Sequence, residues 1–83
     1  MNTNIVKKVV DFLISNNIKC ESIDTVVSID RDNIVEYIDG ICPLFNEEEC
    51  YEEFLQLLIE EFGERFFYSM KSDNNLYLDM IEG

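Results

Sequence analysis

The apolar residues between positions 46 and 63 recur at helical spacing and predict one amphipathic helix. Asn46 suits the cap at its amino end, and Glu49 suits the position that reaches back to the amide of the cap. Gly63 follows the last apolar residue and suits a left-handed terminator. The expected buried stripe contains Tyr51, Phe54, Leu55, Leu58 and Phe62. The expected solvent side contains Glu49, Glu52, Glu53, Gln56 and Glu60. We expect the rest of the chain to pack around this helix.

A second helical pattern begins the chain and runs from Thr3 to about Asn16, with apolar residues on one side. Asn16 and Asn17 suit its end, because Asn tolerates the left-handed conformation. The pattern in residues 18–24 is mixed and indicates a connection with some extended character. The β-branched residues of segment 25–30 then predict a short strand.

The segment after this strand permits two interpretations. In the first, Arg31-Asp32-Asn33 is a turn and residues 34–39 return as the paired strand. In the second, Asp32 caps a short helix, because Ile34, Ile38 and Ile41 also fit one helical face. We favour the hairpin, since similar residue types recur in the same order after the central helix.

That carboxyl-terminal repeat predicts a second hairpin. Residues 65–71 are typical of a strand, residues 72–75 of a turn and residues 76–82 of a returning strand. We expect an inward set of Phe66, Tyr68, Met70, Leu76, Leu78 and Met80. We expect an outward set of Phe67, Tyr77 and Ile81.

These elements, in the order α-β-β-α-β-β, predict an α+β fold of residues 1–83 as a single compact acidic domain. Two helices with apolar stripes and four short antiparallel strands form a two-layer sandwich, with both helices on one face of the sheet.

The charge of the chain restricts its partners. Its 83 residues include 18 acidic and 6 basic residues, which give a net charge of −12. Contact with phosphate needs a basic surface, so this charge weighs against direct binding to nucleic acid or an anionic membrane. It favours a basic partner and speeds encounters with positive surfaces.

The sequence also indicates a compartment. The amino terminus lacks the apolar run of a signal peptide, and no apolar run approaches the ~20 residues that span a bilayer. Cys20, Cys42 and Cys50 are odd in number and have no CxxC spacing. We therefore expect free thiols and a cytoplasmic location.

Residue types that build common catalytic and metal sites are missing or wrongly spaced. The chain has no His, which is the commonest general base and zinc ligand. Asp30, Asp32 and Asn33 resemble the opening of a calcium loop, but Val35 and Ile41 occupy the positions that need Gly and Glu. No glycine-rich phosphate loop or serine elbow occurs. We expect no metal, no cofactor and no enzymatic activity.

The acidic residues provide the main indication of function. Carboxylates one or two helical turns apart are separated by roughly 5–11 Å, which is comparable with the phosphates of nucleic acid. Such a surface could occupy the basic groove of a protein that handles nucleic acid. The candidate partner-binding residues are Glu48, Glu52, Glu53, Glu60, Glu61 and Glu64, with Asp30, Asp32 and Glu36.

We therefore expect a small binding protein that inhibits a basic nucleic-acid-handling partner by DNA mimicry. A nuclease or a CRISPR effector is a partner of this kind, and a phage anti-CRISPR protein, an antitoxin or an immunity protein is the matching inhibitor. The alternative is a self-associating domain, such as a homodimer, which uses the exposed apolar residues of the second hairpin. A merely solvated acidic face is the remaining interpretation.

Overall fold

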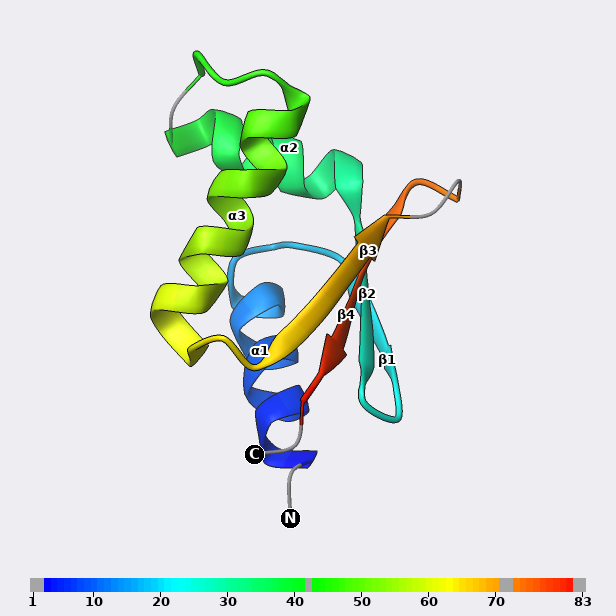
Figure 1. The fold of residues 1–83 in the computed structure, drawn as a ribbon. Coiled ribbons are helices and arrows are strands. Elements are labelled where there is room, and N and C mark those ends of the chain that lie inside the picture. Colours follow the sequence, from blue (N-terminus) through cyan, green and yellow to red (C-terminus); the bar gives the residue numbers. More distant parts are fainter. Residues whose placement is uncertain (1–2, 42, 71–72, 82–83) are drawn as a thin grey trace.

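The computed structural model describes residues 3–41, 43–70 and 73–81, which form three helices and four strands. The helices are α1 (Thr3–Ser15), α2 (Arg31–Ile41) and α3 (Glu47–Phe62). The strands are β1 (Cys20–Ile23), β2 (Val26–Asp30), β3 (Phe66–Met70) and β4 (Asn75–Met80). Figure 1 shows the helices on one side of the sheet, as a two-layer α+β sandwich requires.

The sheet is antiparallel and has the strand order β1-β2-β4-β3. Its two central strands supply the inner face, where Val27 lies opposite Leu78 and Ile29 lies opposite Leu76. These four side chains are fully buried beneath the helices. The predicted order α-β-β-α-β-β and the antiparallel sheet are confirmed, with α2 as an additional helix.

The predicted strand at residues 34–39 is wrong, because this segment lies in α2. Ile34 and Ile38 are four residues apart and both are buried, as on one face of a helix. The Asp30 carboxylate accepts a hydrogen bond from the Asp32 N–H at 2.9 Å, in the manner of a helix cap. The strand at 26–30 instead pairs with β1, which precedes it, so its hairpin partner comes before the strand and not after it.

Helix α3 has the predicted boundaries and the predicted amino-terminal cap. The Asn46 side chain accepts from the Glu49 N–H at 2.9 Å, and the Glu49 carboxylate accepts from the Asn46 N–H at 3.0 Å. This reciprocal pair is a capping box. Gly63 has a φ of 83° and donates its N–H to the Ile59 carbonyl, but its ψ of 176° lies outside the left-handed helical region. Four residues of the predicted stripe, Tyr51, Phe54, Leu55 and Leu58, are buried, and Phe62 is half-buried.

The second hairpin is present, with the predicted assignment of faces. Phe66, Tyr68 and Met70 lie opposite Met80, Leu78 and Leu76, so the predicted inward residues share one face. The two strands are nevertheless buried to different extents. Leu76, Leu78 and Met80 of β4 are buried, whereas Tyr68 is 58% exposed and Met70 is 40% exposed. Strand β3 therefore lies beyond most of the helical cover.

Candidate partner-binding surface

Helix α3 presents its acidic residues to solvent. Glu47, Glu48, Glu49, Glu52, Glu53, Glu60 and Glu61 are all exposed. The helix contains no Lys or Arg, and three of these glutamates lie in its first turn, where the helix dipole stabilises negative charge. Glu48 and Glu52 are one turn apart, and Glu52 and Glu60 are two further turns apart. The predicted solvent side of α3 is therefore exposed, as expected.

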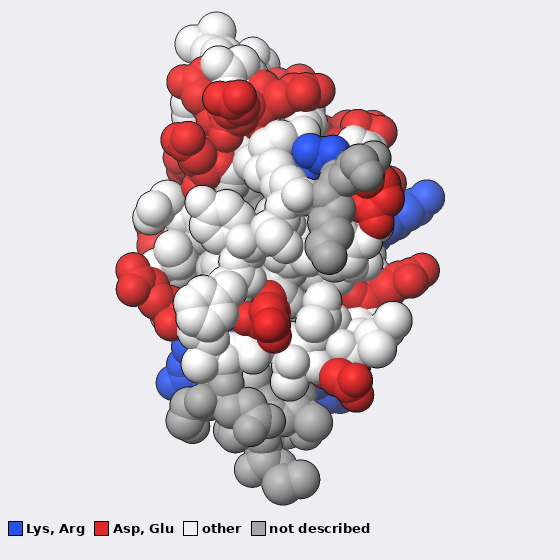
Figure 2. Space-filling model, turned by 45° about the vertical axis from the view of Figure 1, so that its right-hand side comes forward, with Lys and Arg blue, Asp and Glu red and all other residues white. Residues whose placement is uncertain are grey.

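Helix α2 packs against α3 and adds further acidic residues. Asp32 and Glu36 are exposed on α2, and Asp39 extends the same surface. Asp30 ends β2 and is half-buried, with its carboxylate bonded to the Asp32 N–H. In Figure 2, acidic side chains gather over the end of the molecule where α2 and α3 meet. We call the exposed acidic residues of α2 and of the first two turns of α3 the acidic end: Asp32, Glu36, Asp39, Glu47, Glu48, Glu49, Glu52 and Glu53.

Three predicted site residues, Glu60, Glu61 and Glu64, lie beyond the acidic end, and the last two are in a region of mixed charge. A surface depression contains Glu61 together with Lys8, Asp11 and Arg65. Glu64 is exposed beside Arg65 in the chain. Basic side chains in this region reduce the negative potential, so Glu61 and Glu64 contribute less to a purely acidic surface than Glu48, Glu52 and Glu53.

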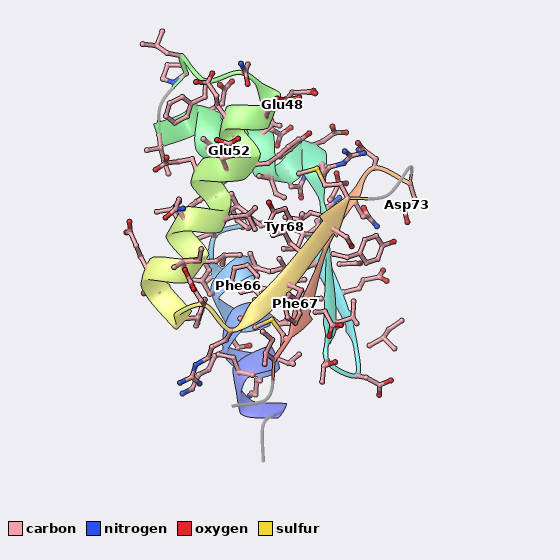
Figure 3. All side chains as sticks on the ribbon, viewed as in Figure 1. Glu48, Glu52, Phe66, Phe67, Tyr68 and Asp73 are labelled. Carbon is pink, nitrogen blue, oxygen red and sulfur yellow. The ribbon has the colours of Figure 1, made fainter. Side chains whose placement is uncertain are left out.

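An open groove of about 460 Å³ separates α3 from β3. This α3–β3 groove is lined by Phe45, Glu49, Glu52, Glu53, Leu55, Gln56, Ile59 and Tyr68. Three of these residues are acidic and none is basic. Figure 3 shows Phe66 and Tyr68 on the side of β3 that faces α3, and Phe67 on the opposite side. The groove thus combines apolar walls with carboxylates that the sequence had placed on a solvated helix face.

The groove could not be predicted from the amino-acid sequence, because its residues come from three separate segments. Phe45 lies before α3, Ile59 lies late in α3, and Tyr68 lies on β3. The available signal was the pattern of β3 itself, which consists of Phe-Phe-Tyr-Ser-Met without a charge. An uncharged aromatic strand at the edge of a sheet indicates a surface for another chain.

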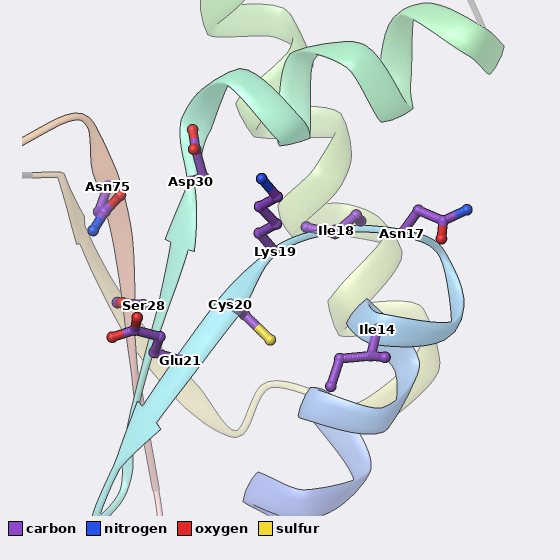
Figure 4. Close-up of a pocket in the computed structure, with 9 residues that line it drawn as sticks. All are labelled: Ile14, Asn17, Ile18, Lys19, Cys20, Glu21, Ser28, Asp30 and Asn75. Carbon is purple, nitrogen blue, oxygen red and sulfur yellow. The ribbon is translucent and has the colours of Figure 1, made fainter.

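A larger depression of about 770 Å³ lies at the other edge of the sheet, beside β1 (Figure 4). Its lining comes from both faces of the sheet. Cys20 points toward Ile14 of α1, whereas Glu21 and Ser28 lie on the opposite side of the strand. Burial raises the pKa of the Cys20 thiol, which disfavours the reactive thiolate. This depression does not bring an activated nucleophile and a base together.

The segment that resembled a calcium loop has a structural role. The Asn33 side-chain oxygen accepts the Lys19 N–H at 3.0 Å and ties α2 to the start of β1. The Asp30 carboxylate accepts the Asp32 N–H and thereby caps the start of α2. Within residues 3–41, 43–70 and 73–81, no group of three His, Cys, Asp or Glu side chains is placed to hold a metal ion. Cys20 is a free thiol, the buried Cys50 thiol donates to the Phe45 carbonyl at 4.0 Å, and Cys42 lies outside the described residues.

The outer face of the sheet is the second exposed surface. In the row that crosses all four strands, Ile23 lies opposite Val26, Val26 opposite Asp79, and Asp79 opposite Phe67. Ile23 is 73% exposed and Phe67 is 69% exposed. The predicted outward residues Phe67, Tyr77 and Ile81 thus lie on the face that the helices leave open, interspersed with the carboxylate of Asp79.

No helix in the described part of the chain is long and apolar enough to cross a membrane. Comparison of the chain with protein-family models, curated proteins and solved structures found no significant match.

Proposed function

We propose that this protein is a small cytoplasmic binding protein that inhibits a basic nucleic-acid-handling protein. Its acidic end would occupy the groove in which the partner holds nucleic acid. A nuclease or a CRISPR effector is the proposed class of partner, and anti-CRISPR, antitoxin and immunity proteins are the corresponding classes of inhibitor. The observation that carries this proposal is a helix with seven exposed glutamates and no basic residue.

The position of α3 supports this assignment. Its apolar stripe is used by the core, where Phe54 and Leu58 are fully buried. Apart from Glu49, which completes the capping box, the exposed glutamates of its acidic side contribute little individually to stability. Carboxylates at one-turn spacing are about 6 Å apart along the helix axis, which corresponds to roughly every second phosphate of one DNA strand, at ~3.4 Å per phosphate along the duplex axis. A basic groove could therefore meet this side of α3 as it meets a phosphate backbone.

Charge reversal on α3 tests the proposal. The protein is used at low salt to capture binding partners from the cells that produce it, and each captured protein is identified. The triple variant Glu52→Lys, Glu53→Lys and Glu60→Lys should fold normally by circular dichroism and lose the partner. The control reverses Asp11, Glu21 and Asp79 to Lys, which changes the net charge equally at exposed sites outside α3. Equal binding by the two triple variants would contradict a role for the acidic side of α3.

Self-association is the alternative, and the open face of the sheet favours it. Ile23, Val26 and Phe67 are apolar residues of one outward row, interrupted by Asp79, that a second copy could cover. Light scattering distinguishes the two functions. A dimer formed through these residues should persist at moderate salt, because apolar burial is not screened, and Phe67→Asp should dissociate it.

A further inference from the structure

Strand β3 leaves one edge of the sheet open beside the α3–β3 groove. It is last in the strand order, and among the described strands it pairs with β4 alone. Figure 1 shows its other edge turned toward α3. Natural edge strands are usually protected by charged residues, Pro or bulges. The five residues of β3 include no charged residue and no Pro, so this edge is available for pairing.

The register identifies which backbone groups face outward. The Ile81 N–H donates to the Arg65 carbonyl at 2.6 Å, and these two residues are directly opposite. Hydrogen-bonded and non-hydrogen-bonded pairs alternate in an antiparallel ladder. The N–H and C=O of Phe67 and Ser69 therefore point to β4. Those of Phe66, Tyr68 and Met70 point to the open edge.

The side chains beside this edge are also accessible. Tyr68 and Met70 belong to the inner face by register, yet they are 58% and 40% exposed. Tyr68 lines the groove together with Ile59 and Leu55 of α3. A strand added beside Tyr68 would place alternate side chains over these apolar residues, because side chains of paired residues share a face.

We propose that the open edge of β3 and the α3–β3 groove bind an extended, basic segment of a partner protein by strand addition. This inference rests on the proposed function, since it specifies how the basic partner is held. Charge complementarity selects the occupant: Glu49, Glu52 and Glu53 line the groove, and none of its lining residues is basic. A second copy would bring another net charge of −12 to the same place, so self-pairing is disfavoured.

The geometry specifies the sequence pattern of the bound segment. Its groove-facing residues should be Arg or Lys, whose aliphatic stems pack on Ile59 and Tyr68 while their charged groups reach Glu52 and Glu53. Its alternate residues lie on the outer face of the sheet, next to Phe67, and should be apolar. Basic and apolar residues should thus alternate with a period of two.

The test uses a short synthetic peptide in which Arg alternates with Val. The control peptide has the same composition, with the Arg residues in one block and the Val residues in another. Isothermal titration with the full chain should show binding of the alternating peptide that is tighter than that of the control by about tenfold or more. Equal affinities would show attraction by charge alone and would overturn strand addition.

Two variants separate backbone pairing from side-chain contact. Tyr68→Ala removes the side chain and keeps the N–H, whereas Tyr68→Pro also removes the N–H that faces the open edge. Tyr68→Pro should bind the alternating peptide about tenfold more weakly than Tyr68→Ala, and equal affinities would overturn the proposal. By register, the N–H groups of Tyr77, Asp79 and Ile81 donate to Ser69, Phe67 and Arg65, and none donates to residue 68. Hydrogen exchange at these three amides should therefore stay slow in Tyr68→Pro if the sheet is intact.

A modified peptide gives a measurement that does not depend on the folding of a variant. N-methylation of one alternate set of its amides blocks one edge of the peptide, and methylation of the other set blocks the opposite edge. One methylated peptide should bind and the other should not; equal binding by both would overturn the proposal.

The proposed function and strand addition can fail separately. The proposed function fails if reversal of the α3 charges leaves capture of the cellular partner unchanged while the alternating peptide still binds as expected. If instead capture needs the α3 charges but is unaffected by Tyr68→Pro, only strand addition fails.

Discussion

Truncation of Phe54 should remove a large part of the stability of this domain. Phe54 lies in the middle of α3, is 0% exposed and is the largest of the fully buried side chains. Phe67 of β3 provides a matched control, because the same substitution there alters a side chain that is 69% exposed. The pair compares one chemical change in two environments.

The expected magnitudes follow from burial. A chain of 83 residues has a free energy of unfolding of about 4–12 kcal/mol. Phe54→Ala should lower it by about 3–5 kcal/mol through lost burial and a cavity. The higher helix propensity of Ala offsets only about 0.5 kcal/mol. Phe67→Ala should change it by about 0.5 kcal/mol or less, as surface substitutions usually do.

Urea denaturation followed by circular dichroism measures both variants. Phe54→Ala should also lower the melting temperature by about 12–40 °C, at about 4–8 °C per kcal/mol for a domain of this size. If Phe54→Ala and Phe67→Ala were destabilised equally, within about 1 kcal/mol, the reasoning that orients α3 by its apolar stripe would be refuted.

Three further predictions concern the cap, salt and pH. Asn46→Ala should lower the free energy of unfolding by about 1 kcal/mol in urea, because the Glu49 N–H loses its acceptor, while Asn46→Ser should restore most of it. Added sodium chloride should raise the urea midpoint by screening repulsion among the acidic residues, and a midpoint that falls with salt would contradict net repulsion. The hydrogen bond from the Tyr77 hydroxyl to Asp73 raises the pKa of Tyr77, so its stabilising effect is complete below the unfolded-state pKa of about 10 and is lost as pH rises through the folded-state pKa. Asp73→Asn should lower the pKa of Tyr77 in an ultraviolet absorbance titration, and an unchanged titration would show that Asp73 is not the cause.

The central helix was predictable because independent local signals agreed on it. The capping box of Asn46 and Glu49, the apolar stripe through Phe54 and Leu58, and the glycine at position 63 all indicate the same boundaries. The carboxyl-terminal hairpin was predictable for a similar reason. The apolar residues Leu76, Leu78 and Met80 occupy every second position, which is the pattern of a strand with one buried face.

The first half of the chain was harder to predict because its periodicity is ambiguous. The β-branched residues Ile34, Val35 and Ile38 suit a strand by residue type, yet Ile34 and Ile38 are also one helical turn apart. Tertiary packing against α3 selects the helix. Strand β1 carries no alternation, because Glu21 and Ile23 are exposed together with Ser22 at the edge of the sheet. Its pairing with β2 comes from the fold and not from its own pattern.

The candidate site was predictable only in its charges. The exposed glutamates of α3 follow from helical periodicity, so Glu48, Glu52 and Glu53 could be placed on the solvent side. The α3–β3 groove depends on how far the helices extend over the sheet, which no local pattern encodes. The same tertiary arrangement brings Lys8 and Arg65 beside Glu61 and divides the acidic residues into two environments.

Competition with DNA is the measurement that tests the central claim most directly. The captured partner is titrated with a fluorescent DNA duplex at several fixed concentrations of this protein, and binding is followed by fluorescence anisotropy. If the acidic end occupies the nucleic-acid groove, the apparent Kd for DNA should rise in proportion to the protein concentration without reaching a plateau. The charge-reversed α3 variant should leave this Kd unchanged. A ternary complex of partner, DNA and protein, with the Kd for DNA unaffected, would contradict the account.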